Sequence, residues 1–323
     1  DISYGTKAED FRSPDLFHPD NLAYDALDRN NFRIPIFRRE GITTSLSRPQ
    51  GGMISGFGVA FDLAESVPLI HKKVALYGSM TKNNMKDLNR SMAFSQWKKL
   101  FADALHLQKN PTLYNRVESK PLIANERELK ALFPVLKGEI PFVVTVQRAD
   151  EIRRLIEWVE QIKSKGAKIN LIIRGGAESW LVAKTLAEKK IPVMFQPSSQ
   201  VPDSFAKLRS RFDLGAVLEK AGVPIIISDT GDMGSSRLRQ EAGLAAKYGL
   251  SPAAALRAIT SNPRQYFKLG HRGLLGENEM ANLVLWTGDP LEPTSRAQYI
   301  WIHGQLQDYG DRQTLLGNKY LNH

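Results

Sequence analysis

The middle of the chain alternates between short apolar runs and longer segments in which apolar residues recur every three or four positions. The run Pro141-Phe-Val-Val-Thr-Val146 is typical of a strand buried on both faces. A helix is predicted from Asp150 to Lys163, because one of its faces is lined by Ile152, Leu155, Ile156, Val159 and Ile162. Gly166 ends this helix. The two segments together form one strand–helix unit.

The same unit repeats along the next hundred residues. Further strands are predicted at Ile169–Ile173, Pro192–Phe195 and Val223–Ser228, and further helices at Glu178–Lys189, Phe205–Ala221, Ser236–Tyr248 and Pro252–Thr260. Ser251 is a suitable N-cap for the last helix, and Asn262-Pro263 is expected to stop it. Successive units of this kind require parallel strands, in a doubly wound sheet or a (β/α)₈ barrel. No Gly-x-Gly-x-x-Gly or Gly-Lys-Ser/Thr motif supports a nucleotide-binding sheet, so the barrel is favoured.

The two ends of the chain have a different pattern of apolar and polar residues. A helix is predicted over Asn21–Asn30 and a strand over Gly41–Leu46. The stretch Gly51–Gly58 holds four glycines and is interpreted as a flexible loop, with a turn requirement favoured over anion binding because no helix follows it. Near the other end, Asn282–Trp286 and Gln298–Ile302 are expected to be short strands of a small β appendage.

Composition and charge remove several classes of protein. The 323 residues include no Cys, which excludes disulfides, thiol nucleophiles and Cys-ligated metal sites. No apolar run approaches the roughly 20 residues of a membrane-spanning helix, so no membrane partner is expected. The 44 Lys and Arg exceed the 34 Asp and Glu by ten, but they are scattered, so no nucleic-acid partner is expected either. The chain is expected to be soluble, and its compartment stays open between the cytoplasm and, after signal removal, the periplasm.

Several segments match one known pattern. They are Glu241–Pro263, Leu283–Ser295, Ile302–Gly304, Arg39–Thr44, Pro49–Gly56 and Val143–Asp150. Together they resemble the imidazolonepropionase-like branch of the amidohydrolase superfamily. The resemblance implies an α/β (β/α)₈ barrel over residues 20–275 and a small β-sandwich appendage over residues 276–310 with N-terminal residues. It also implies hydrolysis of carbon–nitrogen bonds by water activated on one or two divalent metal ions such as zinc.

The chain departs from the ligand pattern that the resemblance implies. The sequence holds no His-x-His pair, and the first barrel strand that would carry it is expected to be missing from this chain or to lie upstream of Asp1. Thr145 stands at the fifth-strand His position and Arg174 at the sixth. Only Asp229 matches, as metal ligand and catalytic base. The six histidines are too far apart in sequence to form a local pair, although His18 and His71 remain open as single ligands. A divalent metal is therefore expected if the protein is active, and none if the centre is degenerate.

Polar residues at the expected strand ends suggest what occupies the active-site cavity of the predicted barrel. In such barrels the active site lies at the carboxyl ends of the strands, where Gln147, Arg148, Arg174 and Asp229 follow predicted strands. An Arg174–Asp229 ion pair could fill the space structurally, or Gln147 and the two arginines could bind the substrate or an anionic ligand. Two functions stay open: a hydrolase of small cyclic amides or dipeptide-like molecules, and a catalytically silent binding or assembly module. A homo-oligomer is expected only because members of the family often associate.

Overall fold

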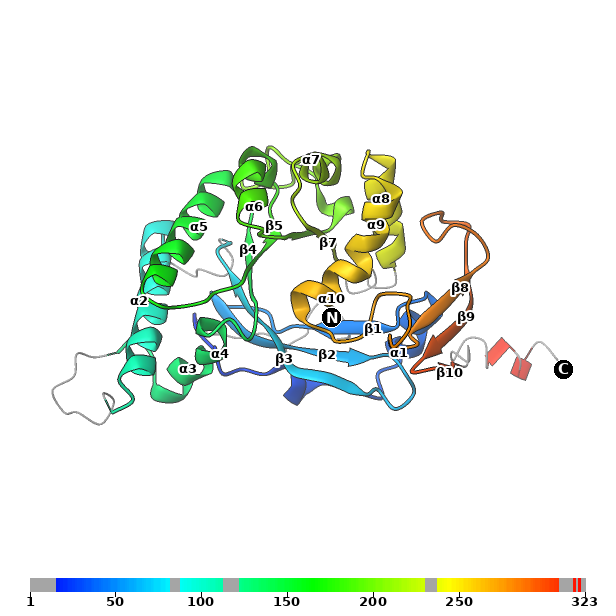
Figure 1. The fold of residues 1–323 in the computed structure, drawn as a ribbon, viewed down its shortest axis with the longest axis horizontal. Helices are drawn as coiled ribbons and strands as arrows, with labels where there is room; N and C mark the ends of the chain where they lie inside the picture. Colours follow the sequence, from blue (N-terminus) through cyan, green and yellow to red (C-terminus); the bar gives the residue numbers. More distant parts are fainter. Residues whose placement is uncertain are drawn as a thin grey trace.

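The computed structural model describes residues 16–81, 88–112, 122–229 and 237–307, and the short pieces 316–317 and 319–320. Its centre is a curled seven-stranded sheet in which the strands follow one another in chain order (Figure 1). The strands are β1 (Thr44–Ser47), β2 (Ile54–Asp62), β3 (Leu69–Ser79), β4 (Phe142–Val146), β5 (Leu171–Gly175), β6 (Val193–Phe195) and β7 (Ile225–Ile227). Strands β3 to β7 are parallel, as the repeated units predict, whereas β1, β2 and β3 pair antiparallel. The described residues form a curled, half-barrel sheet of mixed direction.

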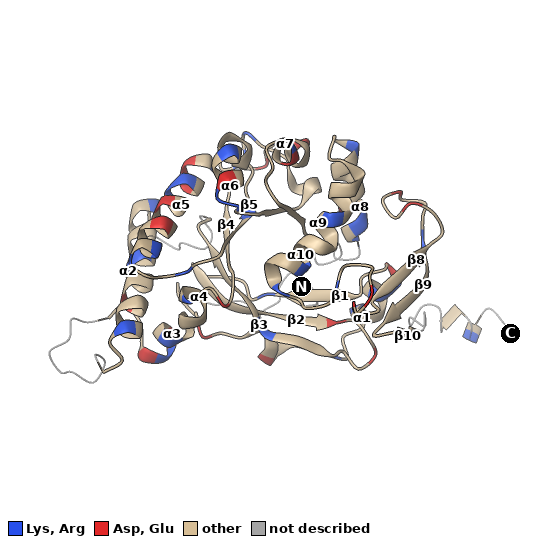
Figure 2. Ribbon diagram, in the orientation of Figure 1, with Lys and Arg blue, Asp and Glu red and all other residues tan. Residues whose placement is uncertain are grey.

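Helices cover the outer face of this sheet (Figure 1), and both basic and acidic residues are spread along them (Figure 2). The helical elements in chain order are η2 (Ala23–Ala26), α1 (Arg33–Arg39), α2 (Arg90–Lys109), α3 (Glu126–Ala131), α4 (Phe133–Leu136), α5 (Ala149–Ser164), η5 (Ser179–Val182), α6 (Ala183–Glu188), η6 (Pro197–Ser199), α7 (Leu214–Lys220), α8 (Leu238–Lys247), α9 (Pro252–Ile259) and α10 (Ser261–Phe267). The predicted helix after Pro141–Val146 is α5, which buries the face that carries its apolar residues. Its Trp158 packs on Phe101 of α2, with ring centroids 5.0 Å apart, in the outer core. Among the described residues, no helix has the length and apolar character of a membrane span.

A second, inner core fills the concave side of the curl. It is formed by alternate residues of successive strands, such as Tyr77, Val143 and Ile172, which point away from the outer helices. Phe267 and Leu269, in and after α10, pack into the same core. The last helix therefore lies inside the curl rather than on its outside (Figure 1).

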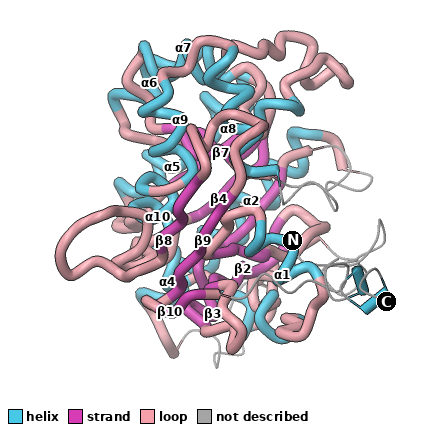
Figure 3. The backbone as a smooth tube through the Cα atoms, turned by 90° about the vertical axis from the view of Figure 1, so that its right-hand side faces the viewer, coloured by secondary structure: helices cyan, strands magenta, loops and turns pink. Residues whose placement is uncertain are grey.

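A small three-stranded antiparallel sheet lies beside the main one (Figure 3). Its strands are β8 (Leu283–Trp286), β9 (Ala297–Ile302) and β10 (Gln305–Leu306), which confirms the two strands predicted near the end of the chain. Ile300 and Ile302 of β9 pack against α1 and β2 in a third apolar cluster. Residues 1–15 and 308–310, which the predicted appendage includes, lie outside the described residues.

Several predicted elements are wrong in extent. The Phe205–Ala221 helix is reduced to α7, because residues 201–213 form isolated turns and the side chain of Phe205 is 93% exposed. The Asn21–Asn30 helix is only the 3-10 turn η2. Asn262-Pro263 does not end the helical region: the backbone breaks at Thr260, and Pro263 stands in the first turn of α10, where its missing N–H leaves no bond unmade.

The glycine-rich stretch is also not a flexible loop along its whole length, since β2 begins at Ile54. Gly56 lies inside this buried strand with φ of +113°, and a Cβ there would come within 2.4 Å of the Asn21 carbonyl oxygen. Gly58 would meet the Tyr77 ring at 2.6 Å. These two glycines are therefore required by close packing of neighbouring chain segments.

Candidate anion-binding site

Three polar side chains stand in one row across the carboxyl ends of β3, β4 and β5. Ser79 is the register partner of Thr145, and Thr145 is the register partner of Arg174. Residues paired in this way across parallel strands point to the same face of the sheet. Tyr77 and Ile172, two positions earlier on their strands, belong to the inner core, so the row lies directly above that core on the concave side.

Arg174 is held in place by its neighbour in the row. Its Nη1 donates to the hydroxyl of Thr145 at 3.2 Å, and its Nε is buried without a hydrogen-bond partner among the described residues. Burial, and then the charge of Arg48, lower the pKa of Arg174 to about 9, while Tyr77 acts in the opposite direction. The guanidinium is thus charged at neutral pH, but its positive charge is poorly balanced by its surroundings.

Arg48 brings a second positive charge to the same place. It follows β1 and lies over the ring of Tyr77, 5.9 Å from the ring centroid to its Cζ. Burial lowers its pKa as well, and burial raises the pKa of Tyr77. Tyr77 is 4% exposed, so its phenol stays neutral between the two arginines at neutral pH.

These side chains line a cavity of about 190 Å³. We call it the arginine pocket, and it is lined by Arg48, Gln50, Gly51, Ser55, Tyr77, Gly78, Ser79, Thr81, Thr145 and Arg174. Among the described residues, two guanidinium groups and several hydroxyl groups line it, and no carboxylate does. Such a set of donors suits a carboxylate or a phosphate.

Gln147 and Arg148 lie outside the residues that line this pocket. The Oε1 of Gln147 accepts from the backbone N of Ala177 at 3.2 Å, which ties β4 to the turn after β5. That turn needs Gly175, where φ is +85° and a Cβ would lie 2.5 Å from the Gln147 amide nitrogen. Arg148 is the residue before α5. The substrate-binding role of both residues stays a prediction.

Asp229 follows β7 and belongs to a different group of side chains. The amide nitrogen of Gln196, which follows β6, lies 3.4 Å from Asp229 Oδ1 and 3.1 Å from Glu241 Oε1. Glu241 is 6% exposed and also accepts from the backbone N of Ser198 at 2.8 Å. Among the described residues no Arg174–Asp229 ion pair is found, so a filling of the cavity by that pair stays a prediction. Arg174 bonds to Thr145 because the two are adjacent in register.

Comparisons with known proteins agree with this fold. A solved amidohydrolase of Thermotoga maritima superposes with a TM-score of 0.79 and 22% identity, covering 91% of this chain and 79% of that one. The amidohydrolase tasK of Hapsidospora irregularis is 32% identical over 95 residues, which are 29% of this chain and a tenth of that protein's length. These likenesses agree with the predicted resemblance to the amidohydrolase superfamily, and the superposition shows that the fold is shared. No protein-family model matches the chain.

The predicted resemblance implies a metal centre, but the described residues at the two assigned histidine positions do not fit one. The positions that the resemblance assigns to histidine ligands hold Thr145 and Arg174, which are hydrogen-bonded to each other. A guanidinium has no lone pair to offer a metal, and the nearby charge of Arg48 repels a cation further. Asp229 alone cannot build a site that needs three or four ligands.

The sequence pattern does not point to Arg48, Tyr77 and Ser79. It marks only residues after the predicted parallel strands, whereas Arg48 follows an antiparallel strand and β3 is not among the predicted strands. The alternation of polar and apolar residues from Val74 to Ser79 is weak, because six successive residues there are buried.

Proposed function

We propose that this chain is an amidohydrolase-like protein whose metal centre is degenerate and whose arginine pocket binds the carboxylate or phosphate of a small molecule. The observation that carries the proposal is the position of Arg174. It stands where the resemblance implies a metal ligand, half-buried, with Arg48 beside it and Thr145 orienting it. A bound anion would neutralise the two charges that the pocket leaves close together.

The size of the pocket limits the ligand. Pockets for drug-sized molecules measure roughly 300–1,000 Å³, so about 190 Å³ suits a small anion or the anionic end of a larger molecule. The proposal includes the rest of the family layout. A barrel-like unit covers residues 20–275, and a small β appendage covers residues 276–310 with N-terminal residues.

The alternative is a hydrolase of carbon–nitrogen bonds with Asp229 as metal ligand and general base. It is favoured by the amidohydrolase fold and by the position of Asp229 after β7, at the same edge of the sheet as Arg174. It needs metal ligands other than the residues at the fifth- and sixth-strand positions. The two functions therefore differ in metal content and in which residue carries the function.

The test combines elemental analysis with calorimetric titration of inorganic phosphate and succinate. We expect no stoichiometric metal at Asp229 and binding of at least one anion that Arg174→Ala weakens roughly 10- to 100-fold, the value of one charged hydrogen bond. Arg153→Ala is the matched control, since Arg153 lies on the exposed side of α5 in an ion pair with Asp150 and does not line the pocket. A stoichiometric metal that is lost with hydrolytic activity in Asp229→Asn would establish the alternative instead.

A further inference from the structure

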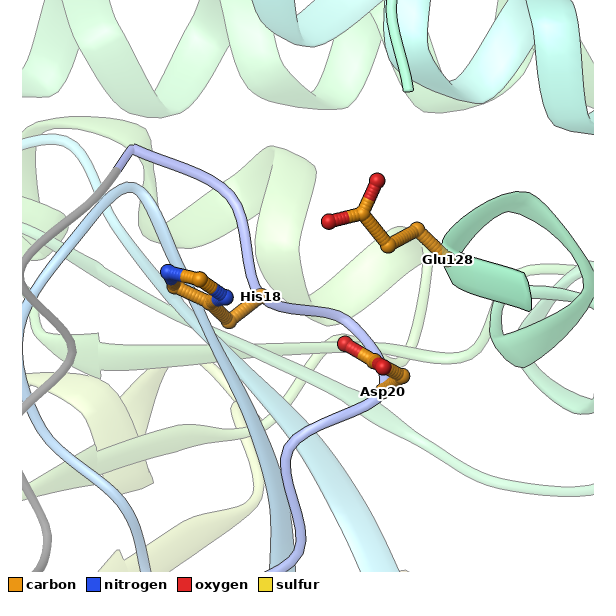
Figure 4. A group of neighbouring side chains, drawn as sticks. All are labelled: His18, Asp20 and Glu128. Atoms are coloured by element: carbon orange, nitrogen blue, oxygen red, sulfur yellow. The ribbon is translucent and has the colours of Figure 1, made fainter. Parts of the chain in front are cut away.

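Three side chains with metal-binding atoms meet away from the arginine pocket. His18, Asp20 and Glu128 each offer one ligand atom, and these atoms lie within 4.8 Å of one another. Figure 4 shows Glu128 extending from the start of α3 toward the loop that carries His18 and Asp20. All three are half-buried, which strengthens their interaction with a cation relative to a fully exposed group.

The loop that carries His18 and Asp20 is fixed to the sheet. Phe17 and Leu22 form parallel bridges with Ile54 and Phe57 of β2, and the backbone N of His18 donates to the Ile54 carbonyl at 2.9 Å. These contacts set the backbone on both sides of the two potential ligands. Their side chains can therefore adjust while their Cα atoms stay in place.

The third residue is fixed from the other side. Glu128 and Asn125 form a capping box: the Asn125 backbone N donates to Glu128 Oε2, and the Glu128 N donates to Asn125 Oδ1, both at 2.9 Å. This bond uses one carboxylate oxygen of Glu128. The other oxygen remains available on a side chain whose direction the cap already fixes.

One positively charged side chain already lies near these three residues. Arg127 Nε contacts Asp20 Oδ2 at 3.0 Å, but its side chain is 83% exposed. Exposed ion pairs of this kind contribute about 0–1 kcal/mol, so a divalent ion could displace the guanidinium at little cost.

We propose that His18, Asp20 and Glu128 bind one divalent transition-metal ion of the zinc class. One imidazole nitrogen with two carboxylate oxygens is a ligand set that Zn²⁺ and Co²⁺ accept, whereas Ca²⁺ and Mg²⁺ prefer oxygen alone. Ligands about 2.1 Å from a tetrahedral ion are about 3.4 Å apart. Side-chain rotations that shorten the present separation of up to 4.8 Å by at most about 1.4 Å would complete the three-residue site.

Binding here would join parts of the chain more than a hundred residues apart. The loop at His18 packs on β2, and Glu128 belongs to α3, so the ion would stabilise their docking. The proposed site lies on side chains that the arginine pocket does not use. The metal site and the proposed function can therefore be tested, and can fail, independently of each other.

The test is calorimetric titration of the metal-free full chain with Zn²⁺, and titration with Co²⁺ followed by its visible absorption. We expect about one ion per chain, and a rise in melting temperature with Zn²⁺. His18→Ala should weaken binding about 10- to 100-fold or more, since loss of even an outer hydrogen-bond partner has that effect at metal sites. His106→Ala removes an exposed imidazole elsewhere, on α2, and should leave the affinity unchanged.

Glu128→Gln separates metal binding from folding. Glutamine can keep the capping bond to Asn125 but lacks the negative charge, so this variant should fold normally and still bind Zn²⁺ more weakly. The proposal would be overturned if folded His18→Ala or folded Glu128→Gln bound Zn²⁺ as tightly as the wild-type chain does. Equal loss of affinity in His106→Ala would also overturn it, because the ion would then be bound elsewhere.

Discussion

Arg272 holds the buried carboxylate of Asp62 through three donor–acceptor contacts of 2.8 to 3.1 Å, across 210 residues of sequence. The Asp62 side chain is fully buried, and it also accepts from Thr44 and Asn282 and contacts His303 Nε2 at 2.6 Å. These partners come from β1, from the segment before β8 and from the turn after β9. One carboxylate therefore ties the main sheet to the small one.

Asp62→Ala is expected to destabilise the protein by about 3–5 kcal/mol. The Arg272 side chain is only 14% exposed, and the substitution removes the buried negative charge that it pairs with. Urea unfolding monitored by circular dichroism measures the effect. Asp203→Ala, which breaks an exposed ion pair with Lys207, is the control and should change stability by less than about 1 kcal/mol. Equal effects of the two substitutions would contradict the structural role of Asp62.

Anion binding in the arginine pocket should weaken as the pH rises through about 9. The folded-state pKa of Arg174 is lowered to about 9, so the guanidinium is charged below this pH and progressively neutral above it. Because a bound anion favours the charged form, binding takes up a proton above pH 9, and the affinity should fall about tenfold per pH unit there. Titrations of phosphate from pH 7.5 to 10.5 test this. A flat profile across pH 9 would contradict the lowered pKa of Arg174, whereas its role in binding is tested by Arg174→Ala.

Gly175→Ala should be more destabilising than Gly222→Ala. Both glycines have positive φ, of +85° and +79°, so both substitutions introduce backbone strain of about 1 kcal/mol or more. Only at Gly175 does the new Cβ also meet a side chain, the amide of Gln147, at 2.5 Å; nothing lies within 4 Å at Gly222. The difference between their unfolding free energies isolates the contact that shapes the turn after β5. No difference would mean that Gln147 moves aside freely.

The double variant Thr145→His, Arg174→His should gain a metal site, with Asp229 at the same edge of the sheet as the third ligand that the resemblance implies. The two positions are register partners on neighbouring strands, so both imidazoles would point to the same face of the sheet. Removal of the guanidinium also removes the charge that repels a cation. Zinc content by elemental analysis should rise by about one ion relative to Thr145→His alone. An unchanged content would argue against a degenerate centre at this place.

The parallel half of the fold could be predicted because its signals are local. The helix over Asp150–Lys163 and the strand before it follow from residue spacing alone, and both are observed as α5 and β4. The antiparallel half could not, because Gly56 and Gly58 are explained by contacts with Asn21 and Tyr77, which are distant in sequence. A glycine-rich strand and a glycine-rich loop have the same local pattern.

The candidate site was predictable only in part for the same reason. Arg174 was found because it ends a predicted strand, and the structure places it beside Thr145. Arg48 reaches the pocket from an antiparallel edge, so its approach depends on how β1 and β2 pair. Likewise, Glu128 and His18 meet only because α3 packs near the loop beside β2, which no residue spacing encodes.

The position of α10 inside the curl has a consequence for synthesis of the chain on the ribosome. The inner faces of β4 and β5, with Val143 and Ile172, are made more than ninety residues before Phe267 and Leu269 cover them. A nascent chain that has reached β7 already has α2 and α5 to α7 for the outer face of its sheet, whereas the apolar residues of the concave face still lack the cover of α10. We therefore expect newly made protein to engage holding chaperones until Leu269 has left the exit tunnel.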